Sequence, residues 1–199
     1  MLLSIKSKGT MSELENYIQH YFSISPDDCK KVAGLFKTET LEKGAYWLKA
    51  GKYCDKMSFI QQGILRMYVS QPDREVTQWI GSAGFFITDI SSFVFRNISK
   101  FNIQALTETR LFTIDHAQYL TLGKLVPKWN EFERLFIGKY FVIMESRVFD
   151  LISKPAEERY QQLFDQNREL FNQVPLQYLA SMLGMTPETF SRIRKKMVS

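Results

Sequence analysis

The residues with the clearest chemical potential lie near the C-terminal end of the sequence. Residues 188–199 hold four basic side chains against a single acid: Arg192, Arg194, Lys195, Lys196 and Glu188. Guanidinium and ammonium groups bind phosphates, and an arginine on one helix face can also reach the edge of a guanine base. A basic run is more often only a solvated helix face, so its role depends on the element that carries it.

The sequence around this run predicts two short helices joined by a tight turn. Pro175 is typical of a first helical position, and Gly184 of the left-handed residue that ends a helix. Thr186 is a capping residue, and Pro187 follows it at the first position of the second helix. Apolar residues recur at three- and four-residue steps on the inner faces: Leu176, Leu179, Ala180, Leu183, Phe190, Ile193 and Met197. This pattern is typical of a helix-turn-helix, whose second helix enters the major groove of DNA.

We therefore expect the outward residues of the second helix to contact double-stranded DNA. Glu188 can accept a hydrogen bond from a cytosine amino group, and Arg192 can donate to O6 and N7 of guanine. The predicted DNA-binding residues are Thr186, Glu188, Thr189, Ser191, Arg192, Arg194, Lys195 and Lys196.

Residues 38–115 have the pattern of short antiparallel strands. Leu65, Met67 and Val69 alternate with Arg66, Tyr68 and Ser70, which predicts one buried and one exposed face. Glycines and a Pro-Asp pair recur at roughly the 8–12 residue spacing of turns in an all-β roll. The predicted fold class is α+β: an N-terminal antiparallel β-roll of the double-stranded β-helix or jelly-roll type with flanking helices, a long helix, and the C-terminal helix-turn-helix. One of the flanking helices is expected to begin at Ser25-Pro26.

The long helix is predicted over residues 127–152. It would extend about 35 Å, which is too long for all its large side chains to pack against a small roll. We expect part of it to face a second copy of the chain as a two-stranded seam. The predicted dimerisation residues are Phe132, Phe136, Tyr140 and Ile143. The alternative is a helix that lies wholly across its own roll.

Composition and the break at Ser153-Lys154-Pro155 set the domain organisation. The 199 residues, 45% of them hydrophobic, suit two globular domains and exclude an intrinsically disordered chain. The net charge of +5 permits nucleic-acid binding. No apolar run approaches the roughly 20 residues of a membrane span, and no export signal is recognisable, so we expect a cytoplasmic protein without membrane contact. The predicted units are an effector domain (11–126), a dimerisation helix (127–152) and a DNA-binding domain (153–199).

The order of these units resembles the Crp/Fnr family of bacterial transcription regulators. The most specific part is Leu-Ala-Ser-Met-Leu-Gly-Met-Thr-Pro-Glu-Thr-Phe-Ser-Arg-Ile-Arg-Lys, residues 179–195, and the linker Lys-Pro-Ala-Glu-Glu-Arg-Tyr, residues 154–160, also matches. The resemblance implies a cyclic-nucleotide-binding-like roll, a homodimer, a palindromic operator and RNA polymerase as a further partner. Family members that read a guanine-rich half-site carry Arg, Glu and Arg at three outward positions. Those positions resemble Pro187, Glu188 and Arg192 here. Because Pro187 cannot make the base contact of the family's first arginine, the operator should differ at the base that this arginine reads.

The matching effector stretch departs from the family's cyclic-AMP binders. A buried cyclic phosphate needs a guanidinium and several N–H donors, and no arginine stands at the place of the family's clamp. We expect a small-molecule effector other than cyclic AMP, at a pocket formed by Phe86, Thr88, Asp89, Ser99, Lys100 and Asn102. The alternative is a ligand-independent regulator whose phenylalanine-rich roll is a packed core and serves only as a structural or protein-interaction module.

Catalysis and metal binding are not expected. Cys29 and Cys54 are too few for the four thiolates of an iron–sulfur cluster. His20 and His116 cannot form the two- or three-histidine site of a metal-dependent β-roll enzyme, although haem ligation by one of them stays open. No nucleophile elbow, phosphate loop or HExxH motif is present. We therefore predict a protein that is not an enzyme.

Overall fold

The computed structural model describes residues 13–22 and 24–198. The predicted start of the effector domain at residue 11 lies outside this range. Two helices precede the strands: α1 (Glu13–Phe22) and α2 (Pro26–Ala33). As the sequence predicts, Ser25 caps α2, and its hydroxyl accepts a hydrogen bond from the Asp28 backbone N–H at 3.2 Å.

Eight short strands follow, and one helix, α3 (Ile90–Phe95), lies between the sixth and the seventh of them. The strands are β1 (Lys37–Leu41), β2 (Tyr46–Leu48), β3 (Lys56–Gln62), β4 (Leu65–Ser70), β5 (Glu75–Gly81), β6 (Phe86–Ile87), β7 (Asn102–Ala105) and β8 (Thr109–Asp115). They form two four-stranded antiparallel sheets, in the orders β1-β8-β3-β6 and β2-β7-β4-β5. Ile60, Leu65, Ile103 and Leu111 are fully buried between the two sheets. The predicted antiparallel roll is confirmed.

One strand departs from the predicted alternation. In β4, Leu65 and Met67 point into the roll, but Arg66 and Tyr68 on the opposite face are also buried. A C-terminal helix, α9 (Leu176–Met182), packs against this part of the roll. The sequence could not indicate this cover, because it comes from about a hundred residues farther along the chain.

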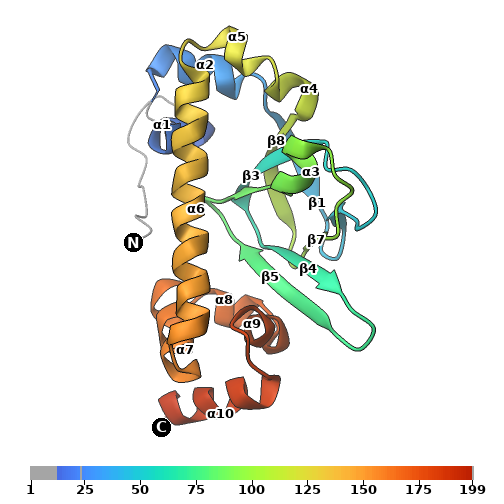
Figure 1. The fold of residues 1–199 in the computed structure, drawn as a ribbon, viewed down its shortest axis with the longest axis vertical. Helices are drawn as coiled ribbons and strands as arrows, with labels where there is room; N and C mark the ends of the chain where they lie inside the picture. The colour runs from blue at the N-terminus through green and yellow to red at the C-terminus, as the bar shows by residue number, and fades with distance from the viewer. Residues whose placement is uncertain (1–12, 23, 199) are drawn as a thin grey trace.

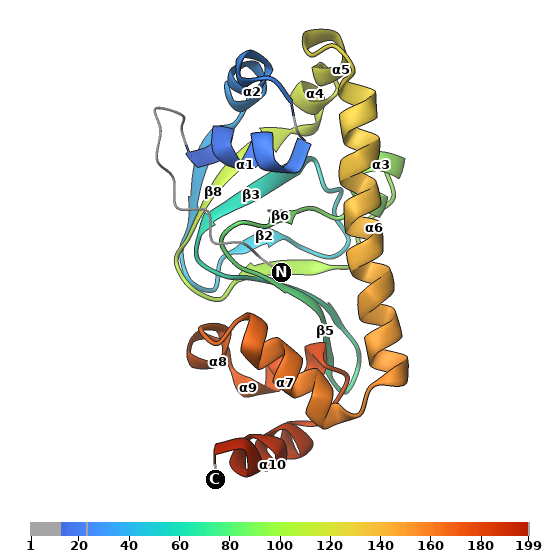
Figure 2. The same cartoon turned by 90° about the vertical axis from the view of Figure 1, so that its left-hand side faces the viewer.

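Seven helices follow in the described residues up to 198. They are α4 (His116–Tyr119), α5 (Leu122–Leu125), α6 (Trp129–Ser153), α7 (Ala156–Gln166), α8 (Leu170–Gln173), α9 and α10 (Pro187–Val198). The 25-residue α6 confirms the predicted long helix and runs along most of the molecule, from α1 and α2 at one end to α7 near the other, with α10 lying beyond its end (Figures 1 and 2). We call α7–α10 the C-terminal unit.

The predicted break after α6 is also observed. Lys154 and Pro155 adopt extended backbone conformations between α6 and α7, since proline cannot continue a helix that needs its N–H. The C-terminal unit shares a hydrophobic core with Ile64 and Ile80 of the roll, and in this core the rings of Tyr160, Phe171 and Phe190 contact one another. The recognition-like helix α10 is thereby fixed to the rest of the unit.

Candidate nucleic-acid interface and effector pocket

The α9–α10 turn has the local geometry that the sequence predicts. Gly184 has φ +66°, a left-handed value that favours glycine, and the Met185 backbone N–H donates to the Ala180 carbonyl at 3.0 Å. The Thr186 hydroxyl accepts from the Thr189 backbone N–H at 3.2 Å and so caps α10. Phe190 is fully buried. These contacts set the direction in which α10 projects.

The outer face of α10 is polar and basic along its whole length. Six of the eight predicted DNA-binding residues are exposed: Thr186, Glu188, Ser191, Arg192, Lys195 and Lys196. Thr189 is half-buried, and so is Arg194, which lies close enough to Tyr160 to act on its phenol electrostatically. Met197, predicted to point inward, is 43% exposed because α10 extends past the core of the unit. The structure therefore brings the predicted residues onto one surface, with Arg194 at its edge.

Two charged residues of α10 have local partners. A hydrogen bond from its own backbone N–H, and a second with Thr186, lower the pKa of Glu188 below its ordinary value. Glu188 is therefore a carboxylate at neutral pH, as an acceptor for a cytosine amino group must be. Lys196 Nζ lies 3.0 Å from a carboxylate oxygen of Glu157. Both groups of this pair are exposed, so the interaction is weak and Lys196 can exchange Glu157 for a phosphate.

The predicted dimerisation residues are spaced by four, four and three positions and so lie on one face of α6, which is turned towards the chain's own roll. Phe136 is only 7% exposed and stacks on Phe22 with ring centroids 4.8 Å apart. The Tyr140 hydroxyl donates to the Phe86 carbonyl at 3.2 Å. Phe136 is thus buried inside its own protomer, and its assignment to an intermolecular seam is corrected. Phe132 and Tyr140 are partly buried against the same core, which leaves only part of each side chain for a seam. Ile143, on the same face, is 43% exposed and lines a cleft next to the roll, and its place in a dimer seam stays a prediction.

A different row of apolar side chains on α6 is exposed. Leu135, Val142 and Phe149 recur every seven residues, and Phe141 and Val148 form a parallel row beside them. Each of the five is at least half exposed, and Ile152 extends the stripe with 80% exposure. A seven-residue repeat of this kind is typical of helices that pair side by side. We call these six residues the α6 stripe.

A cavity of about 430 Å³, which we call the roll pocket, lies between the roll and α6. Phe86, Thr88 and Asp89 line it, as the sequence predicts. The other three predicted pocket residues lie elsewhere. Asn102 accepts from the Ala50 backbone N–H, Ser99 from the Phe101 N–H, and the Lys100 ammonium lies over the Phe101 ring.

The roll pocket is apolar, and its described lining holds no cation. Its walls are mainly Met, Ile, Val and aromatic side chains, and none of the described residues that line it is an arginine or lysine. Its acids are Asp89, which caps α3 by accepting from the N–H groups of Ser91 and Ser92, and Glu133, which accepts from the Tyr119 hydroxyl. A cyclic phosphate would find no guanidinium here.

Several residues that line the roll pocket are not indicated by the sequence. Glu133, Ile137, Phe141 and Met144 of α6 form one wall of the roll pocket. The apolar periodicity of α6 was the only available signal, and it does not tell which face of the helix meets the roll.

The described residues show no sign of a metal site or a membrane span. No cluster of three or more His, Cys, Asp or Glu in residues 13–22 and 24–198 is arranged to hold a metal ion. Across the same residues no helix is both long and apolar enough to cross a bilayer. Both cysteines are buried, and burial raises the pKa of the Cys29 thiol to about 11. The imidazole of His116 packs edge-on against Phe93.

Comparison with known proteins gives one family match and many structural ones. Residues 38–124 match the family model of the cyclic nucleotide-binding domain. FixK2 from Bradyrhizobium japonicum is similar with a TM-score of 0.68 and 15% identity, over 81% of this chain and 84% of that one. A Crp/Fnr-family regulator from Eubacterium rectale is similar with a TM-score of 0.67 and 16% identity, over 92% of this chain and 88% of that one.

A third solved structure is the c-di-GMP-responsive regulator CLP from Xanthomonas campestris. It gives a TM-score of 0.66 and 14% identity, over 87% of this chain and 91% of that one. No curated protein matches the sequence. At these identities the structural matches establish the fold alone. The chain contains a cyclic nucleotide-binding domain at residues 38–124 and has the fold of the Crp/Fnr transcription regulators.

Proposed function

We propose that the protein is a DNA-binding transcription regulator that reads a palindromic operator as a homodimer. The observation that carries this proposal is the exposed face of α10. Glu188 and Arg192 lie one helical turn apart on that face, and buried Phe190 fixes the helix to the C-terminal unit. A helix that a tight turn and a buried aromatic ring hold in place can present both side chains to base edges of the major groove.

The α6 stripe supports the homodimer. Six large apolar side chains on one helix face are exposed in the single chain, and contiguous apolar patches of this kind mark interaction surfaces. The seven-residue spacing of Leu135, Val142 and Phe149 favours the same stripe of a second copy as the partner. Two copies would present two α10 helices, as a palindromic operator requires.

The roll pocket supports control by a small molecule. A volume of about 430 Å³ lies within the range of ligand sites, roughly 300–1,000 Å³, and this favours a sensing roll over a ligand-independent packed core. Its apolar walls, its acids and the lack of a cation among its described residues suit an uncharged or cationic aromatic molecule rather than cyclic AMP. RNA polymerase is a further proposed partner, which rests on the family resemblance alone.

Selection from a library of random DNA duplexes tests the proposal directly. The full-length protein should enrich a sequence with two inverted half-sites centred about one helical turn, roughly 10 base pairs, apart. Arg192→Ala should lose the enrichment, whereas Arg110→Ala, which removes an exposed arginine from β8, should keep it. Enrichment of no sequence by the unmodified protein, in the presence or absence of cell-extracted small molecules, would contradict the proposed function.

A further inference from the structure

We propose a second small-molecule site in the cleft between the roll, α6 and the C-terminal unit, for an apolar molecule that carries a carboxylate or another anionic group. This hinge cleft has a volume of about 400 Å³. Among described residues, Trp79 is the only one that it shares with the roll pocket. The inference does not rest on DNA binding or on the effector of the roll pocket.

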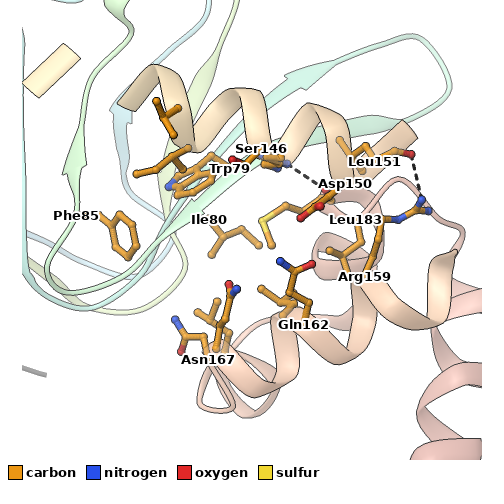
Figure 3. Close-up of a pocket in the computed structure, with 17 residues that line it drawn as sticks. Trp79, Ile80, Phe85, Ser146, Asp150, Leu151, Arg159, Gln162, Asn167 and Leu183 are labelled. Carbon is orange, nitrogen blue, oxygen red and sulfur yellow. Dashed lines mark hydrogen bonds between the residues drawn. The ribbon is translucent and has the colours of Figure 1, made fainter. Parts of the chain in front are cut away.

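Three parts of the chain that are distant in sequence build the walls of the hinge cleft (Figure 3). Trp79 and Phe85 come from the roll, with ring centroids 5.8 Å apart. Ser146 comes from α6, Gln162 from α7, and Leu183 from the end of α9. The aromatic and aliphatic walls provide room for an apolar body, and the polar groups lie on the helical side.

Two guanidinium groups give the hinge cleft its chemical character. Arg147 is half-buried on α6, where its Nη2 donates to the Met182 carbonyl at 3.0 Å and its Cζ lies 5.3 Å from the Trp79 ring centroid. Burial lowers its pKa, which reports the cost of holding this charge away from water. Arg159 donates from Nη1 to the carbonyls of Leu151 and Lys154, at 3.2 and 2.8 Å.

Neither guanidinium is neutralised within the part of the chain that the structure describes. No described carboxylate lies within 4.0 Å of Arg147 or Arg159. Arg159 Nε is buried without any hydrogen-bond partner among those residues. Asp150, the single acid among the described residues of the cleft, already pairs with Lys154 at 2.7 Å.

This imbalance is the physical reason to expect an anion. A buried cation and a buried unsatisfied N–H both cost free energy, and an anionic ligand would satisfy the two together through charge-assisted hydrogen bonds. Such a ligand would contact the end of α6, the start of α7 and the end of α9 at once. It would therefore bias the position of the C-terminal unit against the roll.

The test uses two probes of nearly equal shape, 1-naphthoate and 1-naphthamide, in calorimetric titrations of the full-length protein. The carboxylate should bind at one site per chain, tighter than the amide by about tenfold or more, as expected for a hydrogen bond to a charged group. Arg147→Gln should remove this preference by weakening naphthoate to the level of the amide. Arg110→Gln, the matched loss of an exposed arginine, should leave both affinities unchanged.

A second variant changes the affinity in the opposite direction. Asp150→Asn removes the one carboxylate of the hinge cleft and releases Lys154, so naphthoate should bind a fewfold tighter while the amide is unaffected. A variant that merely damaged the fold could not produce this gain. Equal binding of the two probes by the unmodified protein would overturn the proposal, as would a carboxylate preference that survives in Arg147→Gln or a loss of naphthoate affinity in Asp150→Asn.

Discussion

The guanidinium carbon of Arg66 lies 3.6 Å from the ring centroid of Tyr178, so a strand of the roll and helix α9 of the C-terminal unit share one buried cation. The same guanidinium carbon lies 4.1 Å from the ring centroid of Tyr68, and Arg66 Nη1 lies 2.6 Å from Glu75 Oε2. Next to this contact, the Thr77 backbone N–H donates to the Ser181 hydroxyl at 2.9 Å. The C-terminal unit is therefore docked on β4 and β5 by specific polar contacts as well as by apolar packing.

Replacing Arg66 by methionine should loosen this docking without unfolding the roll. Methionine keeps apolar volume but loses the cation–π contacts, the hydrogen bond to Thr77 and the ion pair with half-exposed Glu75, together worth about 1 to 3 kcal/mol. Local opening of α9 should then be roughly 5- to 150-fold more frequent. Hydrogen exchange followed by mass spectrometry measures this as faster exchange at Leu179, with exchange at Ile60 in β3 unchanged. Arg110→Met is the control, and unaltered exchange in α9 would show that Arg66 does not hold the unit.

The α6 stripe predicts which substitutions on α6 dissociate the dimer and leave the protomer folded. Phe149→Asp places a charge at a position that is 66% exposed in the single chain, so the protomer should stay folded while the dimer dissociates. Phe136→Asp instead buries a carboxylate in the aromatic core with Phe22 and should unfold the roll, at a cost of several kcal/mol. Sedimentation gives the mass and circular dichroism the fold. A dimeric Phe149→Asp protein would place the interface elsewhere.

The sequence predicts those features that depend on neighbouring residues. The cap at Thr186, the left-handed Gly184 and the break at Pro155 are all set within a few residues, and each is observed. The short antiparallel strands were predictable for the same reason, because hydrophobic alternation and turn residues are local signals.

Contacts between distant segments could not be predicted in this way. Phe136 and Tyr140 were assigned to a dimer seam because α6 is apolar on two sides, and periodicity does not distinguish the side that meets the roll. Arg66 was assigned to an exposed face because its cover, Tyr178, belongs to another element. The sequence does not indicate the α6 wall of the roll pocket, because its first residue, Glu133, lies more than thirty positions beyond Phe101, the last lining residue from the roll.

The roll pocket predicts that cyclic AMP does not bind at physiological affinity. Transfer of a phosphate into an apolar cavity with two acids, and with no cation among its described residues, carries a desolvation cost without compensation. Calorimetric titration with cyclic AMP should show no saturable heat at ligand concentrations of tens of micromolar. Saturable binding in the low micromolar range, lost when Phe86 or Thr88 is replaced, would contradict the expectation.

The Asp150–Lys154 pair at the end of α6 gives a pH-dependent prediction. The hydrogen bond with Lys154 lowers the pKa of Asp150, so the pair stabilises the folded state above the unfolded pKa and this contribution is lost as the pH falls through the folded value. Because both groups are partly exposed, Asp150→Asn should cost less than about 1 kcal/mol near neutral pH. In urea denaturation, the difference in free energy of unfolding between the unmodified protein and Asp150→Asn should shrink from about pH 5 towards pH 3. With Asp73→Asn as control, a difference that grows on acidification would exclude this role of the pair.

The residues of α10 should separate by role when binding is measured over a salt series. Arg192 lies one turn after Glu188 on the exposed face, whereas Lys195 lies nearly a turn farther on, where the helix would leave the groove. Arg192→Ala should cost about 1–3 kcal/mol on the selected operator and relax the preference at one base position. Lys195→Ala should weaken operator and scrambled duplexes alike and reduce the slope of log K against log salt by about one unit. If Arg192→Ala weakened both duplexes equally, Arg192 would contact a phosphate, and α10 would lie in the groove at a different depth from the one proposed.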